Sequence, residues 1–578
     1  MKRLTMLIIA LSVLPGWLLA QIPKDADIRA ILSDSYVTDD MLLNADKDTN
    51  NWLLYGRDYS NTRYSPLTQI NQDTVKDLVA KWSFSFGVLE GQDSQAVVHN
   101  GEVFVTTSFN RVYKLDGRTG KVYWSYIRNL PSDVYPYLCC DVVNRGVALY
   151  HDKAYLGTLD AHVVALNRET GEVVWDTTTE DYKAAFSLTV MPLALRGKII
   201  VGTSGAEYGV RGWIMALDAE TGKQAWKTFT IAGPDGPIMA QTGKPYPDWQ
   251  KQWGGDSWKN GGGSGWITGS YDPELNNLYW PVGNPGPDFN GAARPGDNLF
   301  SNTTLVMDPD SGHVKFWFQY TPHDNWDYDG VNEVVLANVD GKRVWLHGDR
   351  NGHLYSIDRT NGKCVWVQAL SEINWVKSWG ENCRPIVNDK FDPEKVGFDK
   401  VTMNIHPSLD GGKEWHPVAY SPKTKMVYVP TYNFGMDLQP LNQKWERGQW
   451  YLGAQVIRIT DGNGALRAHD AATGKLVWSN VNRTPMTSGV LATAGGLVFY
   501  GDPEGYLHAA NDETGEVLWN FQTGTGIHGN PTSFTVDGEQ RVAIVVGAGG
   551  GGLWPLHYGK WLKNNTKGGA LFVFGLHD

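Results

Sequence analysis

One short pattern recurs seven times and constrains the fold more than any other feature of the chain. In each copy Asp or Asn is followed, after two intervening residues, by Thr-Gly, Ser-Gly or Asn-Gly, and then by Trp after three or four more residues. The Asp starts a turn and the Gly supplies a positive φ, so each copy predicts a β-hairpin. The copies begin at Asp116, Asn167, Asp218, Asp308, Asp358, Asp470 and Asn511.

The spacing of these hairpins predicts an all-β fold. Trp124, Trp175 and Trp226 are evenly spaced, whereas the intervals before Trp317 and Trp478 are about twice as long. We expect each long interval to hide one degenerate blade, near Tyr271 to Val282 and near Pro417 to Thr431. The prediction is an eight-bladed β-propeller with tryptophan-docking repeats, in which each Trp packs against the neighbouring blade. The alternative is several small β-domains in tandem.

Both ends of the chain fit this interpretation. Residues 1–20 combine Lys2 and Arg3 with a short apolar run and a small residue, which is typical of a secretory signal peptide. We therefore expect residues 21–578 to form a single propeller domain, exported to the periplasm. Leu571 to Phe574 should close the propeller by pairing with an N-terminal strand.

Composition excludes several function classes. No later apolar run reaches the length of a membrane span, and the net charge of -11 argues against nucleic acid as a partner. The His and Cys spacings give no zinc motif, and no Cys-x-x-Cys-His haem site is present. Only four Cys are present in an exported chain, which indicates a few disulfides. We predict Cys139–Cys140 from their adjacency, and Cys364–Cys383 as a second bridge that their separation permits without requiring.

Four stretches stand apart from the repeat. They are the adjacent Cys139-Cys140, the Ser204-Gly205-Ala206-Glu207 segment, Gly283-Asn284-Pro285, and the acidic loop from Asp324 to Gly330. Each has an ordinary structural explanation on its own, such as a solvated turn or a solvated acidic loop. Taken as one set, their carboxylate and amide oxygens suit a hard cation such as calcium or a lanthanide.

In this order, together with Asp349-Arg350-Asn351-Gly352, the stretches resemble the quinoprotein alcohol dehydrogenases. These are the methanol and ethanol dehydrogenases that use pyrroloquinoline quinone (PQQ). The resemblance runs from about Trp52 to Phe574 and implies that a small alcohol is oxidised by hydride transfer to PQQ. It further implies a soluble cytochrome c as the electron acceptor, because this chain carries no haem.

The resemblance also implies roles for individual residues. It implies that Glu207, Asn284 and Asp327 are the metal ligands and that Asp327 is also the catalytic base. Arg350 would donate hydrogen bonds to the quinone oxygens. Trp266 would stack on one face of PQQ, with Cys139 and Cys140 on the other. The remaining cofactor contacts would be Asp93, Arg145, Thr158, Ser204, Gly205, Ala206, Ser264 and Asn433.

Three positions depart from much of this family. Thr487 stands where members often have Trp near the cofactor, and Asp93 stands where many have Glu. Asp329, two residues after the predicted base, stands where several members have Ala or Ser, and it matches the subset that uses lanthanides. We therefore expect Asp329 to be a fourth metal ligand and a lanthanide ion to be bound, because a trivalent ion balances three carboxylates better than calcium.

Other functions remain open at this point. One is a calcium-dependent quinoprotein for other alcohols, polyols or sugars, and another is a non-catalytic propeller scaffold. The sequence defines neither the exact alcohol nor the oligomeric state, for which a homodimer is one arrangement.

Overall fold

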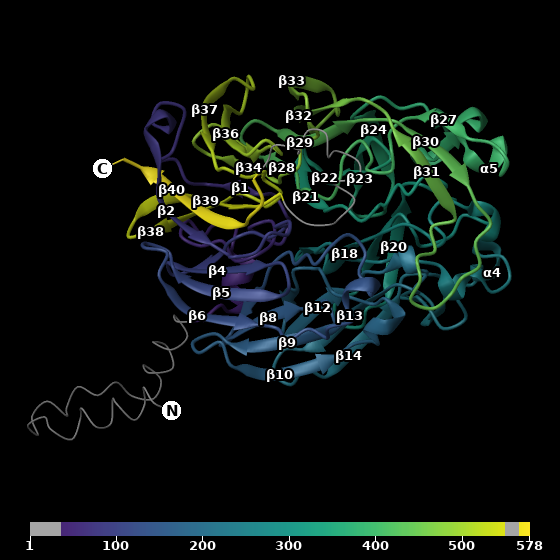
Figure 1. The fold of residues 1–578 in the computed structure, drawn as a ribbon, viewed down its shortest axis with the longest axis horizontal. Coiled ribbons are helices and arrows are strands. Elements are labelled where there is room, and N and C mark those ends of the chain that lie inside the picture. The colour runs from purple at the N-terminus through teal and green to yellow at the C-terminus, as the bar shows by residue number, and fades with distance from the viewer. Residues whose placement is uncertain (1–35, 549–565, 578) are drawn as a thin grey trace, which may run out of the picture.

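The chain folds into sheets that succeed one another around a common centre. The computed structural model describes residues 36–548 and 566–577, so the predicted signal peptide at 1–20 lies outside the described residues. Within the described part, eight sheets each have a set of four antiparallel strands, which short strands extend in two of them, and there are two smaller sheets. Figure 1 shows the eight sheets following chain order from purple to yellow. The all-β prediction is confirmed.

Four of these sheets come from the first half of the chain. They are β3 (Val97–His99), β4 (Glu102–Thr107), β5 (Arg111–Asp116) and β6 (Val122–Ile127); β7 (Ala148–Tyr150), β8 (Lys153–Gly157), β9 (His162–Asn167) and β10 (Val173–Thr178); β11 (Leu193–Leu195), β12 (Lys198–Gly202), β13 (Trp213–Asp218) and β14 (Gln224–Phe229); and β17 (Ser270–Asp272), β18 (Asn277–Val282), β19 (Thr303–Met307) and β20 (Val314–Gln319).

Three sheets follow in the second half, and the last sheet combines strands from both ends. They are β21 (Val335–Val339), β22 (Lys342–Gly348), β23 (His353–Asp358) and β24 (Cys364–Ala369); β28 (Ala419–Ser421), β29 (Met426–Asn433), β32 (Asn463–Asp470) and β33 (Leu476–Asn482); β34 (Val490–Thr493), β35 (Leu497–Gly501), β36 (Tyr506–Asn511) and β37 (Val517–Gln522); and β2 (Leu78–Ser85), β40 (Ala570–Leu576), β39 (Glu539–Val546) and β38 (Thr532–Val536).

Short elements decorate this framework. The strands are β1 (Tyr64–Ser65) beside β34, β15 (Ile238–Met239) between β20 and β16 (Lys244–Pro245), β25 (Val376–Trp379) with β26 (Pro385–Val387), and β27 (Thr402–Ile405) with β30 (Met436–Pro440) and β31 (Ala454–Ile459). The helices and single 3₁₀ turns are α3 (Asp39–Leu43), α4 (Trp249–Gln252), α5 (Pro393–Val396), η2 (Val75–Asp77), η3 (Tyr135–Tyr137), η4 (Tyr182–Ala184), η5 (Ala206–Tyr208), η6 (Ser257–Asn260), η7 (Gly291–Ala293), η8 (Glu381–Cys383) and η9 (Asp389–Phe391). No helix in the described ranges is long and apolar enough to cross a bilayer.

The predicted hairpins are confirmed as the two outer strands of seven sheets. In the β5–β6 turn the Asp116 carboxylate accepts hydrogen bonds from the backbone N–H groups of Arg118 and Thr119, each at 2.9 Å. Gly120 then adopts φ +71° and donates its N–H to the Asp116 carbonyl at 2.8 Å. The repeat therefore encodes a turn whose hydrogen bonds close within the motif itself.

Tryptophan docking links several sheets to the next, as predicted, although Phe316 takes the place of Trp against Gly362. The Trp124 indole donates its N–H to the Arg168 carbonyl at 2.9 Å, and its ring lies against Gly171 in the turn of the following sheet. Trp175 makes the same contacts with Ala219 and Gly222. Because the ring occupies the space that a side chain would need, the turn glycine is required for packing as well as for its positive φ.

The prediction of two hidden blades is wrong. Residues 270–282 form β17 and β18, the inner strands of the sheet that ends in the Trp317 hairpin. Residues 419–433 likewise form β28 and β29 of the sheet that ends at Trp478. The long intervals hold insertions instead, which include α4 in the first and α5 in the second. Spacing alone does not separate an inserted loop from a degenerate blade.

Strands from the two ends of the chain close the arrangement, as expected. Strand β40 inserts between β2 and β39, with Ala80 opposite Phe574 and Phe84 opposite Leu571. Figure 1 shows the purple and yellow strands side by side. The seven repeat hairpins and this composite sheet together account for all eight sheets.

Burial falls from the centre of the molecule outward. The first strands of successive sheets, such as β3 and β7, are buried at every residue, whereas the last strands, such as β6 and β10, alternate with solvent. In an antiparallel sheet the start of the first strand and the turn between the second and third strands lie at the same end of the strands. Loops at these two positions therefore meet at one end of the central axis.

Candidate functional site

The predicted site residues lie on this set of central loops. Asp93 precedes β3, Arg145 precedes β7, and Glu207 lies between β12 and β13. The loop after β18 carries Asn284, and the loop before β21 carries Asp327. Segments far apart in sequence thus bring titratable side chains into the interior.

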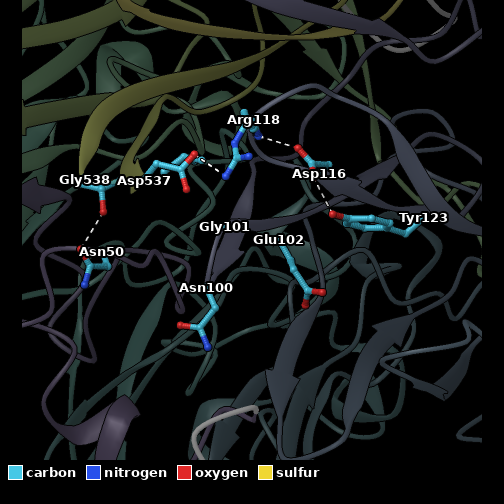
Figure 2. Close-up of a pocket in the computed structure, with 11 residues that line it drawn as sticks. Asn50, Asn100, Gly101, Glu102, Asp116, Arg118, Tyr123, Asp537 and Gly538 are labelled. Atoms are coloured by element: carbon cyan, nitrogen blue, oxygen red, sulfur yellow. Dashed lines mark hydrogen bonds and ion pairs between the residues drawn. The ribbon is translucent and has the colours of Figure 1, made fainter. Parts of the chain in front are cut away.

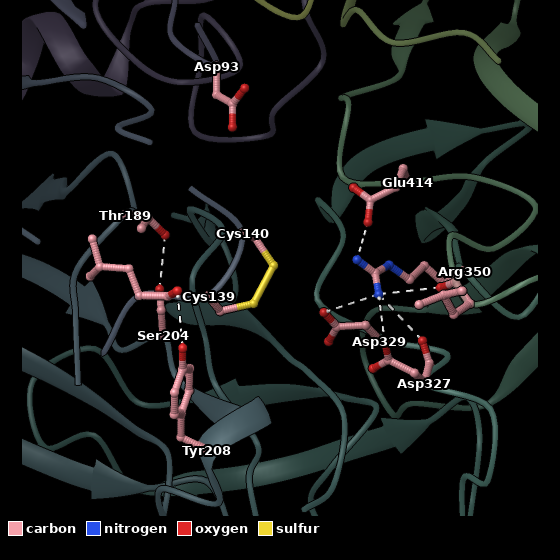
Figure 3. The surroundings of a disulfide bond; sticks show 12 residues. Asp93, Cys139, Cys140, Thr189, Ser204, Tyr208, Asp327, Asp329, Arg350 and Glu414 are labelled. Carbon is pink, nitrogen blue, oxygen red and sulfur yellow. Dashed lines mark hydrogen bonds and ion pairs between the residues drawn. A yellow bond between two sulfur atoms is a disulfide. The ribbon is translucent and has the colours of Figure 1, made fainter. Parts of the chain in front are cut away.

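Arg350 is the centre of an acidic cluster. Its Nη1 lies 3.6 Å from Asp327 Oδ2 and 3.9 Å from Asp329 Oδ2, and its Nη2 pairs with the Glu414 carboxylate. Figure 3 shows the three carboxylates converging on the guanidinium group. The structure therefore brings together Arg350, Asp327 and Asp329, as the resemblance implied.

Backbone geometry fixes Asp329. Its Oδ1 accepts the Asn284 backbone N–H at 2.9 Å, and a Cβ added to Gly283 would lie 2.1 Å from that oxygen. Only glycine at position 283 leaves room for the carboxylate. The Gly-Asn-Pro motif is thus a cradle for Asp329 as well as the source of the Asn284 amide.

A tight turn presents Asp327. The Asp324 carboxylate accepts the backbone N–H groups of Trp326 and Tyr328, each at 2.8 Å, and Asp327 between them has φ +64°. A left-handed conformation at a residue other than glycine costs free energy and is concentrated at functional sites. The acidic loop is therefore an ordered turn, and its first Asp is the residue that shapes it.

Glu207 lies in the 3₁₀ turn η5, next to the Cys pair. Gly205 begins this turn at φ +112°, where a Cβ would come within 2.1 Å of the Ala185 carbonyl. The Tyr208 hydroxyl donates to the Leu138 carbonyl at 3.1 Å, and the Glu207 carbonyl accepts the Tyr451 N–H at 2.7 Å. Contacts on both sides thus hold the Ser-Gly-Ala-Glu segment in place.

Burial and mutual repulsion perturb these acids. Burial, with help from the Asp288 carboxylate, raises the pKa of Asp327 well above its usual range. Burial raises the pKa of Asp329 to about 8, although Arg350 opposes the shift. The pKa of Arg350 rises as well, because Glu414, Asp329 and Asp327 outweigh the lowering by burial. One arginine does not balance so many carboxylates, so the cluster favours a further positive charge.

The second half of the site surrounds Arg145. Its Cζ lies 4.5 Å from the Trp266 ring centroid and 4.6 Å from that of Trp415. Its Nη1 donates to Thr189 Oγ1 at 2.9 Å, and that hydroxyl lies 2.9 Å from Ser204 Oγ. Two flat aromatic faces, a cation and a row of hydroxyls suit a planar ligand that carries carboxylates.

Asp93 belongs to the same half of the site. Its Oδ2 lies 3.8 Å from Arg145 Nη2. Burial raises the pKa of the Asp93 carboxyl to about 7, and Arg145 only partly opposes this shift.

Both predicted disulfides are present. Cys139 and Cys140 are bonded to each other, and Cys364 is bonded to Cys383. Figure 3 shows the first bridge between Ser204 on one side and the Arg350 cluster on the other. The second bridge joins β24 to η8, in one of the long insertions.

The other predicted cofactor residues have varied surroundings. Ser264 is fully buried and its hydroxyl has no hydrogen-bond partner, and Ala206 is fully buried within η5. Thr158 Oγ1 donates to Asp160 at 2.6 Å, and Asn433 Oδ1 accepts the Glu372 N–H at 2.9 Å. These last two side chains thus already have protein partners.

Sequence reasoning missed several residues of the cluster. Glu414 and Trp415 lie in a segment that is anchored by a fully buried ion pair between Lys413 and Glu333, at 3.1 Å. Asp288 follows Asn284 by four residues and is fully buried. The only sequence signals were charged residues inside short apolar or glycine-rich stretches, which also occur in ordinary loops.

The residues present fit the metal ion and PQQ that the resemblance implies. Asn284 is fully buried, and neither Nδ2 nor Oδ1 has a hydrogen-bond partner; the same holds for both carboxylate oxygens of Asp288. Oxygen donors of this kind suit a hard cation. As the side chains stand, no three His, Cys, Asp or Glu residues in the described ranges are gathered closely enough to hold one ion.

A hollow lies elsewhere, among residues that do not belong to this cluster. It measures about 530 Å³ and lies among loops of the β3–β6 and β38–β39 strands (Figure 2). Arg118 pairs there with Asp537, and the Tyr123 hydroxyl donates to Asp116 at 2.6 Å. These charged groups are at least partly exposed to solvent and already pair with one another. We therefore place the functional site in the buried cluster.

Comparison with known proteins identifies the family of this chain. Residues 52–385 match the family model described as glucose/ethanol/alcohol dehydrogenase, beta-propeller domain, and residues 462–558 match that of the outer membrane protein assembly factor BamB. The quinoprotein alcohol dehydrogenase PedH of Pseudomonas putida is 40% identical over 93% of each chain.

Two further relatives are named for their metal. The lanthanide-dependent methanol dehydrogenase of Methylacidiphilum fumariolicum is 37% identical over 93% of this chain and 94% of its own. A europium-containing methanol dehydrogenase structure superposes with a TM-score of 0.88 at 36% identity, over 93% of this chain and all of that one. The chain therefore belongs to the family of PQQ-dependent alcohol dehydrogenases.

Proposed function

We propose that this protein oxidises a small primary alcohol to the aldehyde with PQQ and a lanthanide ion, and passes the electrons to a soluble cytochrome c. We further propose that the eight sheets are the eight blades of one propeller domain, and that the chain is exported to the periplasm. The observation that carries the catalytic proposal is the convergence of Asp327 and Asp329 on Arg350 in the buried interior.

Each side chain has a role that follows from its position. When bound, PQQ supplies the hydride acceptor and the metal ion supplies a Lewis acid. The Asp327 carboxylate accepts the hydroxyl proton of the alcohol, for which a raised pKa makes it a stronger base. Arg350 holds a fixed positive charge 3.6 Å from Asp327 and offsets negative charge that develops during the reaction.

Charge balance supports a lanthanide over calcium. Asp327 and Asp329 are buried acids and Glu207 is partly buried, and burial raises the pKa of all three. Three ionised carboxylates leave excess negative charge around a divalent ion, and a trivalent ion of similar radius removes it. The names of two relatives, which specify lanthanide and europium, support the same choice.

The decisive experiment is reconstitution. Metal-free protein is loaded with PQQ and either calcium, lanthanum, cerium or praseodymium, and oxidation of an alcohol and aldehyde panel is measured with an artificial dye. We expect activity with light lanthanides and little with calcium. Full activity with calcium and none with any light lanthanide would refute the metal assignment. No alcohol oxidation under any condition would refute the function and favour a non-catalytic scaffold.

Asp329→Ala tests the fourth ligand separately. This variant should lose much more lanthanide-supported activity than PQQ affinity, because it removes one charged oxygen donor from the ion. Equal activity in the variant and the wild type would contradict the assignment.

A further inference from the structure

Asp288 is an acid of the cluster whose carboxylate receives no hydrogen bond from the protein. It is fully buried, and neither of its carboxylate oxygens has a hydrogen-bond partner. By contrast, Asp329 accepts the Asn284 N–H and Asp327 lies within 3.6 Å of Arg350. A buried carboxylate without donors is costly, so such a group is retained where a ligand supplies them.

Arg294, six residues further along the chain, does not pair with the Asp288 carboxylate. The donors of Arg294 go to the carbonyls of Pro287 at 2.9 Å and of Asp288 itself at 3.0 Å, to the Asp324 carbonyl, and to Asn298 Oδ1 at 2.7 Å. Arg294 therefore holds the backbone of the loop and leaves the Asp288 carboxylate unpaired.

The loop itself is firmly held. The Phe289 N–H donates to the Leu452 carbonyl at 2.9 Å, and the Asn290 amide donates to the Leu441 carbonyl at 3.0 Å. The Phe289 ring packs in a cluster with Trp326 and Trp375. Asp288 is thus presented from a rigid support, which is how specificity residues are usually held.

Asp288 also adjoins the proposed base. The Gly291 N–H, three residues after Asp288, donates to Asn325 Oδ1 at 2.6 Å, so the loop of Asp288 packs against the turn that carries Asp327. The Asp288 carboxylate also raises the pKa of Asp327. An alcohol whose hydroxyl reaches Asp327 therefore places its neighbouring carbon atoms close to Asp288. A second hydroxyl on such a carbon can donate a charge-assisted hydrogen bond to the free carboxylate.

We infer that Asp288 selects small diols and polyols by accepting a hydrogen bond from a second hydroxyl group, next to the one that reacts. This inference rests on the proposed alcohol oxidation and names its substrate class. A site built to bind a hydroxyl discriminates against the analogue that lacks it, because the buried acceptor is then left unpaired.

The test compares 1,2-propanediol with 1-propanol on the reconstituted holoenzyme. For wild type, Asp288→Leu and Asp288→Asn, kcat/KM is measured for both alcohols, and the ratio of diol to mono-alcohol is the readout. Asp288→Leu should lower this ratio by about 10-fold or more, since a hydrogen bond to a charged group is lost. Asp288→Asn keeps the volume and should lower it by less, which preserves the test if the leucine variant misfolds.

A matched control and the opposing outcomes complete the design. Asp256→Leu changes a carboxylate whose side chain is 79% exposed and should leave the ratio as in wild type. A ratio that stays within twofold in both Asp288 variants overturns the inference, as does an equal loss for both alcohols, which would place Asp288 at the metal instead. A wild-type enzyme that oxidises neither alcohol contradicts the proposed function as well, so the two failures are distinct.

Discussion

At the scale of single residues, the geometry of Asp327 makes it the side chain on which turnover depends most. Replacing Asp327 by Asn keeps the shape and removes the proton acceptor, so kcat should fall by about 10²- to 10⁴-fold. Stability should change little or improve, because one of several mutually repelling buried charges is removed. Dye-linked kinetics and calorimetry on the same sample check both statements. Turnover within a few-fold of wild type, with PQQ still bound, would exclude the role.

The raised pKa of Asp93 predicts that the stability of the fold depends on pH. Its carboxyl titrates near 3.9 in an unfolded chain, and burial raises its pKa to about 7 in the folded protein. Between these values the folded state binds more protons than the unfolded state, so this group makes the protein less stable as pH rises from about 4 to about 7.

Asp93→Asn should therefore flatten the fall in Tm over that range. The measurement is calorimetry of metal-free wild type and variant at several pH values, with Asp256→Asn as an exposed control. Parallel curves for Asp93→Asn and wild type would show that the raised pKa is not present in solution.

The residues of the site were predictable only in part. Asp327, Asp329, Arg350 and the Cys pair stand in distinctive stretches, and the structure joins them as expected. Glu414 and Asp288 carry no such signal, because their importance depends on contacts between loops that are distant in sequence. A motif reports local geometry, whereas an ion pair between two loops depends on the whole fold.

At the scale of elements, the repeat turn is the unit that stabilises the molecule. Gly171 and Gly101 both have φ +75°, yet a Cβ on Gly171 would lie 2.7 Å from the Trp124 ring, and one on Gly101 would have nothing within 4 Å. Gly101→Ala should cost about 1–2 kcal/mol through backbone strain alone. Gly171→Ala should cost at least about 1 kcal/mol more, because the docked ring must shift.

Thermal unfolding of the two alanine variants checks this difference. Equal losses of Tm would mean that the ring adapts without cost, and that docking contributes little to the contact between neighbouring sheets.

The hairpins were the most predictable elements, since seven short motifs contain their own turn hydrogen bonds. The inserted strands and helices were not, because they carry no repeat and their place depends on long-range packing. Phe316 illustrates the limit: it lies against Gly362, the place that Trp takes in other sheets, although Trp317 appeared to be the repeat residue. A shift of one residue exchanges the two faces of a strand.

At the scale of the whole molecule, the composite sheet is what joins the ends. A chain that ends at Gly568 lacks β40 and leaves β2 and β39 with open edges, so it should aggregate or melt at a much lower temperature. A chain that ends at Leu576 keeps all of β40 and is the matched control. Soluble expression and Tm of the two truncations decide the matter, and a stable Gly568 chain would show that closure is dispensable.

The pairing of β2 with β40 also determines when the protein can complete its fold. Strand β2 leaves the ribosome early, and its partner is among the last residues synthesised. Its edge therefore stays open through almost all of translation, and a topology of such high contact order folds slowly. During that time the open edge is a natural substrate for chaperones. Cofactor loading must then follow chain completion, since the loops that form the site come from several sheets that β40 joins into one closed arrangement.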